Sequence, residues 1–347
     1  MGRPLGDADR QLHAELSTAQ RVENMKRILA IIVLYKMTAE DSPTFVELSK
    51  FLKGNDAASE SIELMVCDNT PYKQTAPVDF SGSYIRDSTN PGLAEHYNLA
   101  LRRAEELGGS WLMLLDQDTT VTAEYVEEAL QRTATLATDD RIAALVPKLV
   151  MNGILFSPHL PGYGKRAHPV DRNLTGVPGT RLVAFGSGAL VKVSALREIG
   201  GFPEKFWLDF LDHATFLSLQ DTGREIFVMH SALRHDVSAE KPDKQNDPAY
   251  PARFENVLDA GLGLFQEYGS FRDRLLYRIG LWRQVIGSFR RGWFRLTLRA
   301  LKVAVRHTPH LTRPRPMKLH RSDVTRGSTT KAMRDKCDES AGPPAVR

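Results

Sequence analysis

Cysteine and long hydrophobic runs are scarce in this chain. Only two of its 347 residues are cysteines, Cys67 and Cys337, which excludes a disulfide framework and a four-cysteine metal site and is typical of a reducing, cytoplasmic setting. The longest apolar stretch, 28–35, has the length of a strand and falls short of the roughly 20 residues that a membrane-spanning helix needs. Residues 1–26 form a polar N-terminal extension without the apolar core of a signal peptide.

Glycine-rich nucleotide-binding motifs and internal repeats are missing as well. Neither G-x-G-x-x-G nor G-x-x-x-x-G-K-S/T occurs, so the chain has neither a dinucleotide fingerprint nor a P-loop. Acidic residues are almost absent from 271–321, where Asp273 is the only acid beside 14 Lys and Arg. The remaining residues carry 32 Lys and Arg against 41 Asp and Glu. A basic arm on an acidic body indicates an anionic partner, either a membrane surface or nucleic acid.

What the sequence does contain is an alternation of apolar runs and amphipathic stretches. Strands are expected at 28–35, 62–67, 83–86, 111–115 and 142–146, with helices at 42–52, 92–107 and 122–136 between them. This order predicts an α/β fold with a mostly parallel sheet flanked by helices.

The pattern changes after residue 150. We expect a long surface loop over 157–178, a pair of strands over 182–193, helices over 194–199 and 211–222, and a strand at 225–229. The domain prediction is therefore an α/β domain over 27–240, an amphipathic basic helical region over 250–312 and a disordered tail over 313–347.

Two carboxylates, Asp116 and Asp118, follow the buried run 111–115 with one residue between them. Carboxylates this close repel each other unless a cation or a proton lies between them. Mg²⁺ or Mn²⁺ takes such oxygen ligands, often together with substrate phosphates. The pair therefore predicts a metal-bound diphosphate at a strand end, although Asp-x-Asp is common by chance and an exposed pair of loop acids is the alternative.

Polar residues also follow the first two expected strands, at Tyr35-Lys36 and Asp68-Asn69. The carboxyl ends of parallel strands meet at one edge of a sheet, where open α/β folds bind nucleotides. Further along, Asp209, Asp212 and His235 are candidates for a general base or a ligand. Helix capping is the alternative for the two acids, and an ordinary loop histidine is the alternative for His235.

In their order, these motifs resemble glycosyltransferase family 2, the inverting enzymes of GT-A fold, and most closely its rhamnosyltransferase-like bacterial branch. The resemblance covers 28–237. The matching motifs are Ile31–Tyr35, Asp68-Asn69-Thr70, Asn90-Pro91-Gly92 with Asn98, Asp116-Gln117-Asp118-Thr119, Ser187-Gly188, Gly200-Gly201-Phe202 with Trp207–Asp212, and His235. Each motif alone is weak, but seven in this order and spacing are specific.

The resemblance implies a GT-A type, Rossmann-like domain with a C-terminal basic helical extension. It also implies transfer of rhamnose or a related hexose from a dTDP- or UDP-linked donor to a hydroxyl of a glycan or lipid-linked acceptor, with inversion and with Mg²⁺ or Mn²⁺. The implied roles are nucleotide-sugar binding for Tyr35, Asp68, Asn69, Asn90, Gly92, Asn98, Asp116 and Gln117, acceptor contact for Ser187, Gly188, Trp207 and Asp209, metal ligation for Asp118 and His235, and base catalysis for Asp212.

The chain departs from the family at two positions. Where the family usually has an acid and then an arginine after the second Asp of its late motif, this chain has Ala214 and Ser218. Two other hypotheses therefore stay open. One is a nucleotidyltransferase, although 35–38 is not the expected glycine-rich basic loop; the other is a degenerate glycosyltransferase-like scaffold that works through its basic arm.

The basic arm contains two stripes with helical spacing. The basic stripe is Arg291, Arg295, Arg299, Lys302 and Arg306, and the apolar stripe is Phe294, Leu298, Leu301 and Val305. Such a helix is typical of a peripheral protein lying on an anionic membrane, here the inner face of the cell membrane. A helix packed on the catalytic domain with a solvated basic face is the alternative. Nucleic-acid binding is not expected, since no recognition module accompanies the charge.

Overall fold

The computed structural model describes residues 28–78, 80–164, 167–235 and 250–306. The predictions for 1–26, for 307–347 and for Cys337 lie outside these ranges. The strands are β1 (Ile28–Leu34), β2 (Ile62–Asp68), β3 (Ser83–Arg86), β4 (Trp111–Asp116), β5 (Thr119–Thr120), β6 (Ile142–Met151), β7 (Ile154–Ser157), β8 (Ala189–Lys192) and β9 (Glu225–His235). The helices are α2 (Pro43–Lys53), α3 (Asp56–Ser61), α4 (Leu93–Glu106), α5 (Ala123–Thr135), α6 (Val193–Ile199), α7 (Leu211–Asp221), α8 (Tyr250–Tyr268), α9 (Phe271–Arg290) and α10 (Phe294–Arg306).

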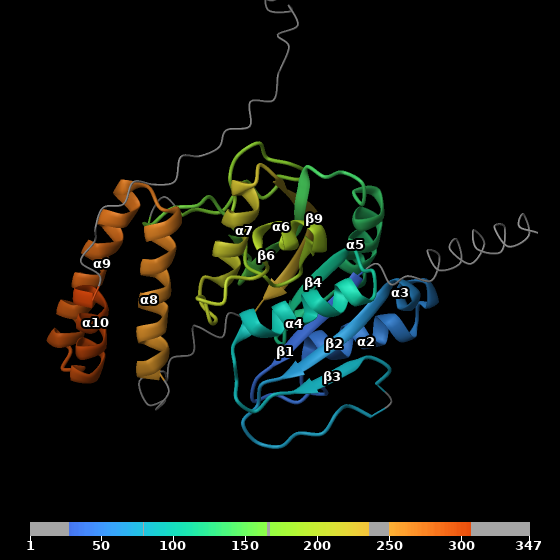
Figure 1. Ribbon diagram of the computed structural model, residues 1–347, viewed down its shortest axis with the longest axis horizontal. Helices are drawn as coiled ribbons and strands as arrows, with labels where there is room; N and C mark the ends of the chain where they lie inside the picture. Colours follow the sequence, from blue (N-terminus) through green and yellow to red (C-terminus); the bar gives the residue numbers. More distant parts are fainter. Residues whose placement is uncertain (1–27, 79, 165–166, 236–249, 307–347) are drawn as a thin grey trace, which may run out of the picture. The chain divides into compact units, whose positions relative to one another are not determined.

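The strands form one central sheet flanked by helices, which confirms the α/β prediction (Figure 1). Its order is β3-β2-β1-β4-β8-β6-β9-β5, with β7 paired to β6. The pairing is parallel from β3 to β4. Beyond β4 it is mixed, because β8 enters antiparallel between β4 and β6 while β6 and β9 are parallel. The chain reaches β8 through a long loop instead of a crossover helix, so it can arrive from the opposite direction.

Side chains of β1 alternate between the two faces of the sheet. Leu29, Ile31 and Val33 pack with α4, α6 and α7, whereas Ile32 and Leu34 pack with α2 and α5. All residues of β1 are buried, because a sheet covered on both faces needs apolar residues at every position of a central strand.

Local signals in the sequence set the helix ends. Ser42 and Thr122 accept the backbone N–H of the residue three positions on, and so cap α2 and α5. Ser270 and Asp273 form a capping box at the start of α9. Gly200 ends α6 with the left-handed backbone that glycine adopts readily.

The strand pair expected over 182–193 is wrong in part, since only Ala189–Lys192 is a strand. Val183 instead makes an isolated bridge with His159 of the preceding loop. Backbone hydrogen bonds of 2.9 and 3.0 Å between these two residues replace a regular ladder.

Helices α8, α9 and α10 have a core of their own. Its buried members are Leu258, Leu262, Phe265, Tyr277, Leu281, Ala300, Val303 and Ala304. Hydrogen bonds are among the contacts that tie these helices to the part of the chain with the sheet: the Ser218 hydroxyl lies 2.7 Å from that of Tyr268, and Asp273 accepts the N–H of Tyr163 at 3.2 Å. Among the described residues, no helix is long and apolar enough to cross a membrane.

Candidate active site

Three strand ends lie side by side at one edge of the sheet. In the parallel register Leu34 is opposite Asp68, and Val33 is opposite Asp116. The residues after β1, β2 and β4 therefore share one rim, as the sequence predicted.

The start of α2 shapes the turn that contains the two carboxylates. Ser42 donates to the carbonyl of Gln117 at 2.6 Å. The Thr44 hydroxyl lies 2.5 Å from the carbonyl oxygen of Asp116 and accepts the N–H of Thr119 at 3.0 Å. Both hydroxyl residues are buried, so these bonds fix the backbone on which Asp116 and Asp118 stand.

The side-chain amide of Gln117 forms its hydrogen bonds within the protein. Its Oε1 accepts the N–H of Tyr35 at 2.7 Å, and its Nε2 lies 3.4 Å from the carbonyl oxygen of the same residue. This pair joins the loops after β1 and β4. The geometry gives Gln117 a structural role, whereas the Tyr35 ring stays partly exposed at the rim.

Asp68 is fully buried, and both of its carboxylate oxygens are in use. Oδ1 accepts the N–H of Thr70 at 2.8 Å and Oδ2 accepts the hydroxyl of Tyr84 at 2.9 Å. Burial, together with this bond, raises the pKa of Tyr84 to about 12. The neighbouring Asn69 bonds through Oδ1 to Nε2 of the buried His96. Both residues thus hold the loop after β2 in place.

Gly92 lies against Trp207. Its φ of +102° is unfavourable for other residues, and a Cβ here would lie 2.4 Å from the indole ring. The N–H of Leu93 donates to the Trp207 carbonyl at 2.9 Å, and the indole N–H donates to the carbonyl of Asn90 at 3.4 Å. The Asn90–Gly92 turn and Trp207, which was predicted to contact the acceptor, are therefore one packed unit.

Asn98 connects α4 to the glycine-rich turn after α6. Its amide donates to the carbonyl of Phe202 at 3.0 Å and its Oδ1 accepts the N–H of the same residue at 2.8 Å. A Cβ on Gly201 would lie 2.6 Å from this Oδ1, which explains the glycine. The side chain predicted to contact the donor is thus used to position the loop that leads to Asp212.

Ser187 links the acidic turn to the loop before β8. Its hydroxyl donates to Oδ2 of Asp116 at 2.5 Å and lies 2.8 Å from that of Thr119. Gly188 has a φ of +76°, and a Cβ here would lie 2.6 Å from Leu233, so only glycine fits. Ser187 is fully buried. Its bond to Asp116 therefore directly connects a residue predicted to contact the acceptor with an acid predicted to bind the donor.

Asp212 lies in the first turn of α7 and contacts the loop before β8, which also contains Ser187. Its Oδ2 accepts the N–H of Gly186 at 3.2 Å. Its Oδ1 lies 2.7 Å from the backbone nitrogen of His213 and 2.8 Å from Nδ1 of that side chain. Phe210, just before the helix, adopts a left-handed φ of 62°, an uncommon conformation for an aromatic residue that redirects the chain into α7.

Two histidines beside Asp212 were not predicted from the sequence. His213 contacts the rings of Phe185 and Phe210, and its ring centroid lies 5.1 Å from that of His159. Burial chiefly, with a further effect of His213, lowers the pKa of His159 to about 4. The Nδ1 atom of His159 is buried without a partner among the described residues. The sequence shows that His213 is next to the candidate base Asp212. It gives no sign that His159, far away in the chain, lies beside them.

Asp209 is a second carboxylate in this region. Burial raises its pKa, Arg253 opposes this and Asp212 adds to it. Its Oδ2 is buried without a hydrogen-bond partner in the described part of the chain. The environment of Asp209 therefore favours its charged form less than an ordinary exposed carboxylate's environment does.

The residues predicted to bind a metal come together only in part. His235 is opposite Thr119 in the pairing of β9 with β5, so a strand 116 residues further along the chain reaches the acidic turn. No cluster of three or more His, Cys, Asp or Glu able to hold an ion occurs among the described residues. Mg²⁺ is often held by one or two carboxylates and completed by substrate phosphates and water. The carboxylate of Asp118 is a ligand of the type that such a site uses.

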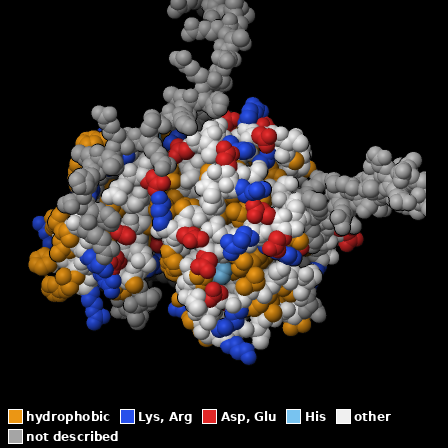
Figure 2. Space-filling model, in the orientation of Figure 1, with side chains coloured by type: hydrophobic (Ala, Val, Ile, Leu, Met, Phe, Trp, Pro, Cys, Tyr) orange, Lys and Arg blue, Asp and Glu red, His pale blue; other side chains and the backbone are white. Residues whose placement is uncertain are grey.

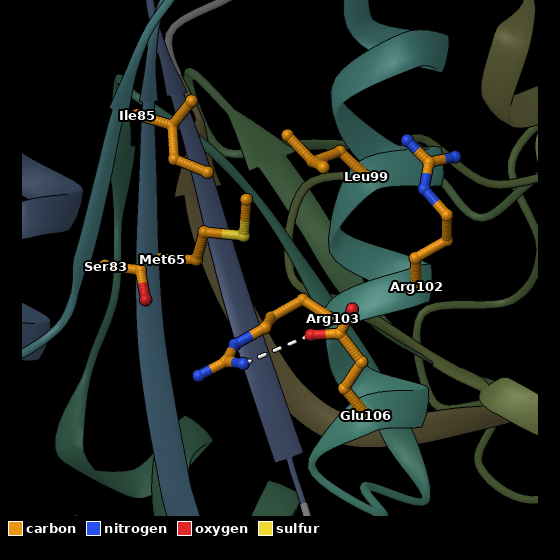
Figure 3. Close-up of a pocket in the computed structure, with 7 residues that line it drawn as sticks. All are labelled: Met65, Ser83, Ile85, Leu99, Arg102, Arg103 and Glu106. Atoms are coloured by element: carbon orange, nitrogen blue, oxygen red, sulfur yellow. Dashed lines mark hydrogen bonds and ion pairs between the residues drawn. The ribbon is translucent and has the colours of Figure 1, made fainter.

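A small hollow lies away from this rim, between β2, β3 and α4 (Figure 3). It is lined by Met65, Ser83, Ile85, Leu99, Arg102, Arg103 and Glu106, with Arg103 paired to Glu106 at 3.2 Å. It contains none of the predicted site residues. The carboxylates of the rim, and not this hollow, therefore define the candidate site.

Comparison with known proteins gives similarities of structure only. No protein-family model matches the chain. No curated protein matches it either. Among solved structures, the chain is similar to TarS of S. aureus, residues 1–349, with 14% identity and a TM-score of 0.42 over 80% of this chain and 90% of that one.

Two further solved structures are longer than the matched region. A longer TarS structure has 15% identity and a TM-score of 0.42, with 80% of this chain and 55% of that one covered. GalNAc-T7 with UDP, GalNAc and Mn²⁺ has 11% identity and a TM-score of 0.47, with coverages of 82% and 60%. All three matches have TM-scores below 0.5, so they carry no argument about the fold family of this chain. Similarity at this level is too low to assign an activity.

Proposed function

We propose that this chain is a metal-dependent inverting glycosyltransferase of family 2 type. One observation carries the proposal: two consecutive residues connect the donor-side acid to the candidate base. Ser187 bonds Asp116, and Gly186 bonds Asp212. A donor diphosphate at the acidic turn and an acceptor hydroxyl at Asp212 would then lie on opposite sides of one short loop, as an in-line displacement requires.

In this mechanism Asp212 accepts the proton of the acceptor hydroxyl while that oxygen attacks the anomeric carbon of the donor. The N–H groups of Gly186 and His213 hold the carboxylate in one orientation. Asp116 binds the sugar or ribose, and Asp118 with His235 would hold Mg²⁺ or Mn²⁺. When bound, that ion neutralises the charge that grows on the leaving diphosphate.

The proposed donor is a dTDP- or UDP-linked rhamnose or related hexose, and the acceptor is a hydroxyl of a glycan or a lipid-linked glycan. A lipid-linked acceptor would bring this cytoplasmic enzyme to the inner face of the cell membrane. These assignments rest on the resemblance of the sequence motifs.

Ala214 and Ser218, the two departures from the family, both make contacts that hold α7 in place. Ala214 is fully buried in the core. Ser218 lies 2.7 Å from the hydroxyl of Tyr268 on α8 and donates to the carbonyl of Ala214 at 2.8 Å. The helix that presents Asp212 therefore has other contacts in place of the acid–arginine pair, which favours an active enzyme over a degenerate scaffold.

The test is hydrolysis and transfer with a panel of dTDP- and UDP-sugars in the presence of Mn²⁺. We expect one or a few donors to react, chelation to abolish the reaction, and Asp118→Asn to lower it by about 10²-fold or more. Asp140→Asn, an exposed acid elsewhere, is the matched control. Release of pyrophosphate from a nucleoside triphosphate with a sugar phosphate would instead identify a nucleotidyltransferase, and an inert panel would favour the scaffold.

A further inference from the structure

Helices α9 and α10 expose an unusual amount of apolar surface. Nine of the sixteen exposed large hydrophobic residues in the described part of the chain lie on these two helices. They are Phe271, Leu275, Ile279, Trp282, Ile286 and Phe289 on α9 and Phe294, Leu298 and Val305 on α10. We call these nine residues the outer face; the orange side chains at the edge of Figure 2 where α10 lies belong to this region.

The outer face is not the core-facing side of either helix. In α9 the buried residues are Asp273, Tyr277, Leu281 and Ser288, which alternate with the exposed set at helical spacing. In α10 Leu296, Ala300, Val303 and Ala304 are buried. Both helices therefore already have a packed side, and the outer face is a second apolar stripe directed away from it.

The two stripes form one continuous surface. Phe289 near the end of α9 and Phe294 at the start of α10 are 60% and 64% exposed, and their ring centroids lie 6.1 Å apart. The stripe predicted for α10 is thus the smaller half of a surface whose larger half lies on α9.

Arginine borders this surface. Each of Phe271, Trp282, Phe289 and Phe294 is exposed and is followed directly by an exposed arginine, namely Arg272, Arg283, Arg290 and Arg295. Successive residues of a helix are about 100° apart, so on α9 these arginines form a row along one side of the aromatic residues. Over 271–306 there are ten Lys and Arg and a single acid, Asp273, which is engaged in the capping box.

We infer that the outer face docks on an anionic lipid bilayer, with the apolar side chains in the acyl boundary and the arginines at the headgroups. Aromatic and aliphatic residues flanked by arginine are what an interfacial helix needs. The chain's own residues 307–347 are a poor occupant, because with nine Lys and Arg against four acids they carry the same sign of charge. A second copy would bring the two arginine rows together, which charge repulsion opposes.

The experiment is flotation of the full-length protein with vesicles of phosphatidylglycerol and phosphatidylcholine, at about one to three, and with phosphatidylcholine alone. We expect binding to the anionic vesicles, weakened by salt, and little binding to the neutral ones. Trp282→Ser with Ile286→Ser should lower binding more than tenfold, and Ile154→Ser on β7, which is 70% exposed, should leave it unchanged.

A second pair of variants tests the charge without altering the apolar residues. Arg283→Gln with Arg290→Gln should weaken binding about fivefold for each charge removed, whereas Lys50→Gln with Lys53→Gln on α2 should have no effect. Retained flotation in both outer-face variants would overturn the inference. So would a stable dimer that the Trp282 and Ile286 substitutions dissociate. Nucleotide-sugar hydrolysis in solution should be unchanged in all four variants, which separates this test from that of the proposed activity.

Discussion

The Nδ1 atom of His213 lies 2.8 Å from Oδ1 of Asp212, and the backbone nitrogen of His213 lies 2.7 Å from the same oxygen. With the N–H of Gly186 on the other oxygen, both oxygens of the carboxylate are held by the loop before β8 and by the first turn of α7. A general base works only if its carboxylate is held toward the proton that it takes. This relationship makes Asp212 the best candidate for the base.

Replacing Asp212 by Asn should abolish sugar transfer and preserve donor binding. Asn has nearly the same shape, but it cannot accept the proton, so we expect kcat to fall by about 10²- to 10⁴-fold. Donor binding is measured by titration with the nucleoside diphosphate. Asp221→Asn at the end of the same helix is the control, because its carboxylate is 49% exposed and pairs with Arg181. Transfer at the normal rate by Asp212→Asn would assign the base elsewhere.

Replacing His213 should alter the base without removing it. In His213→Leu the side-chain donor is lost, and we expect kcat to fall about tenfold with little change in the donor KM. His213→Asn can still donate to Asp212 and should recover most of the loss. Steady-state kinetics of both variants over a pH series is the measurement. Equal defects in the two variants would show that His213 only fills space among Phe185 and Phe210.

Gly92→Ala should destabilise the protein through its contact with Trp207. The new Cβ would lie 2.4 Å from the ring in a backbone with φ of +102°, and we expect a loss of about 1–3 kcal/mol in the free energy of unfolding. Gly179→Ala is the matched control, since its φ is also positive, at +65°, but nothing lies within 4 Å of its Cβ. Urea unfolding compares the two, and equal losses would mean that backbone strain alone is responsible.

His159 should make the stability depend on pH in the acid range. Burial lowers its pKa to about 4, whereas an unfolded histidine titrates near 6.5. Between these values the unfolded chain binds a proton that folded His159 does not. The stabilisation is therefore complete above about pH 6.5 and is lost as the pH falls toward 4, by about 1.4 kcal/mol per unit.

His159→Gln removes this linkage, so its free energy of unfolding should fall less steeply over the same pH interval. His230→Gln, at an exposed histidine on β9, should retain the slope of the parent protein. Urea titrations at several pH values measure both. A parent slope unchanged by His159→Gln would place the titrating group elsewhere.

Much of the fold follows from local patterns in the sequence. A few neighbouring residues are enough to predict many of the strands and helices. Examples are the buried run 28–34, the helix caps Ser42 and Thr122, and the glycines that end helices. The direction of β8 was missed because an antiparallel insertion depends on where a long loop returns. The apolar residues of the exposed stripe of α9 recur with helical spacing in the sequence. Because this helix has two apolar sides, however, the sequence does not show which side is buried.

The sequence by itself determined most of the strands and helices, although not β5, β7 or α3, because periodicity, caps and turns act over a few residues. It also determined the order of the polar residues that follow the strand ends. The tertiary structure decided which polar side chains form hydrogen bonds within the protein. The bond from Ser187 to Asp116 spans 71 residues, and the bonds between Asn98 and Phe202 span 104. No local pattern specifies partners so far apart, since only the packing of the sheet and its helices brings them within hydrogen-bond distance.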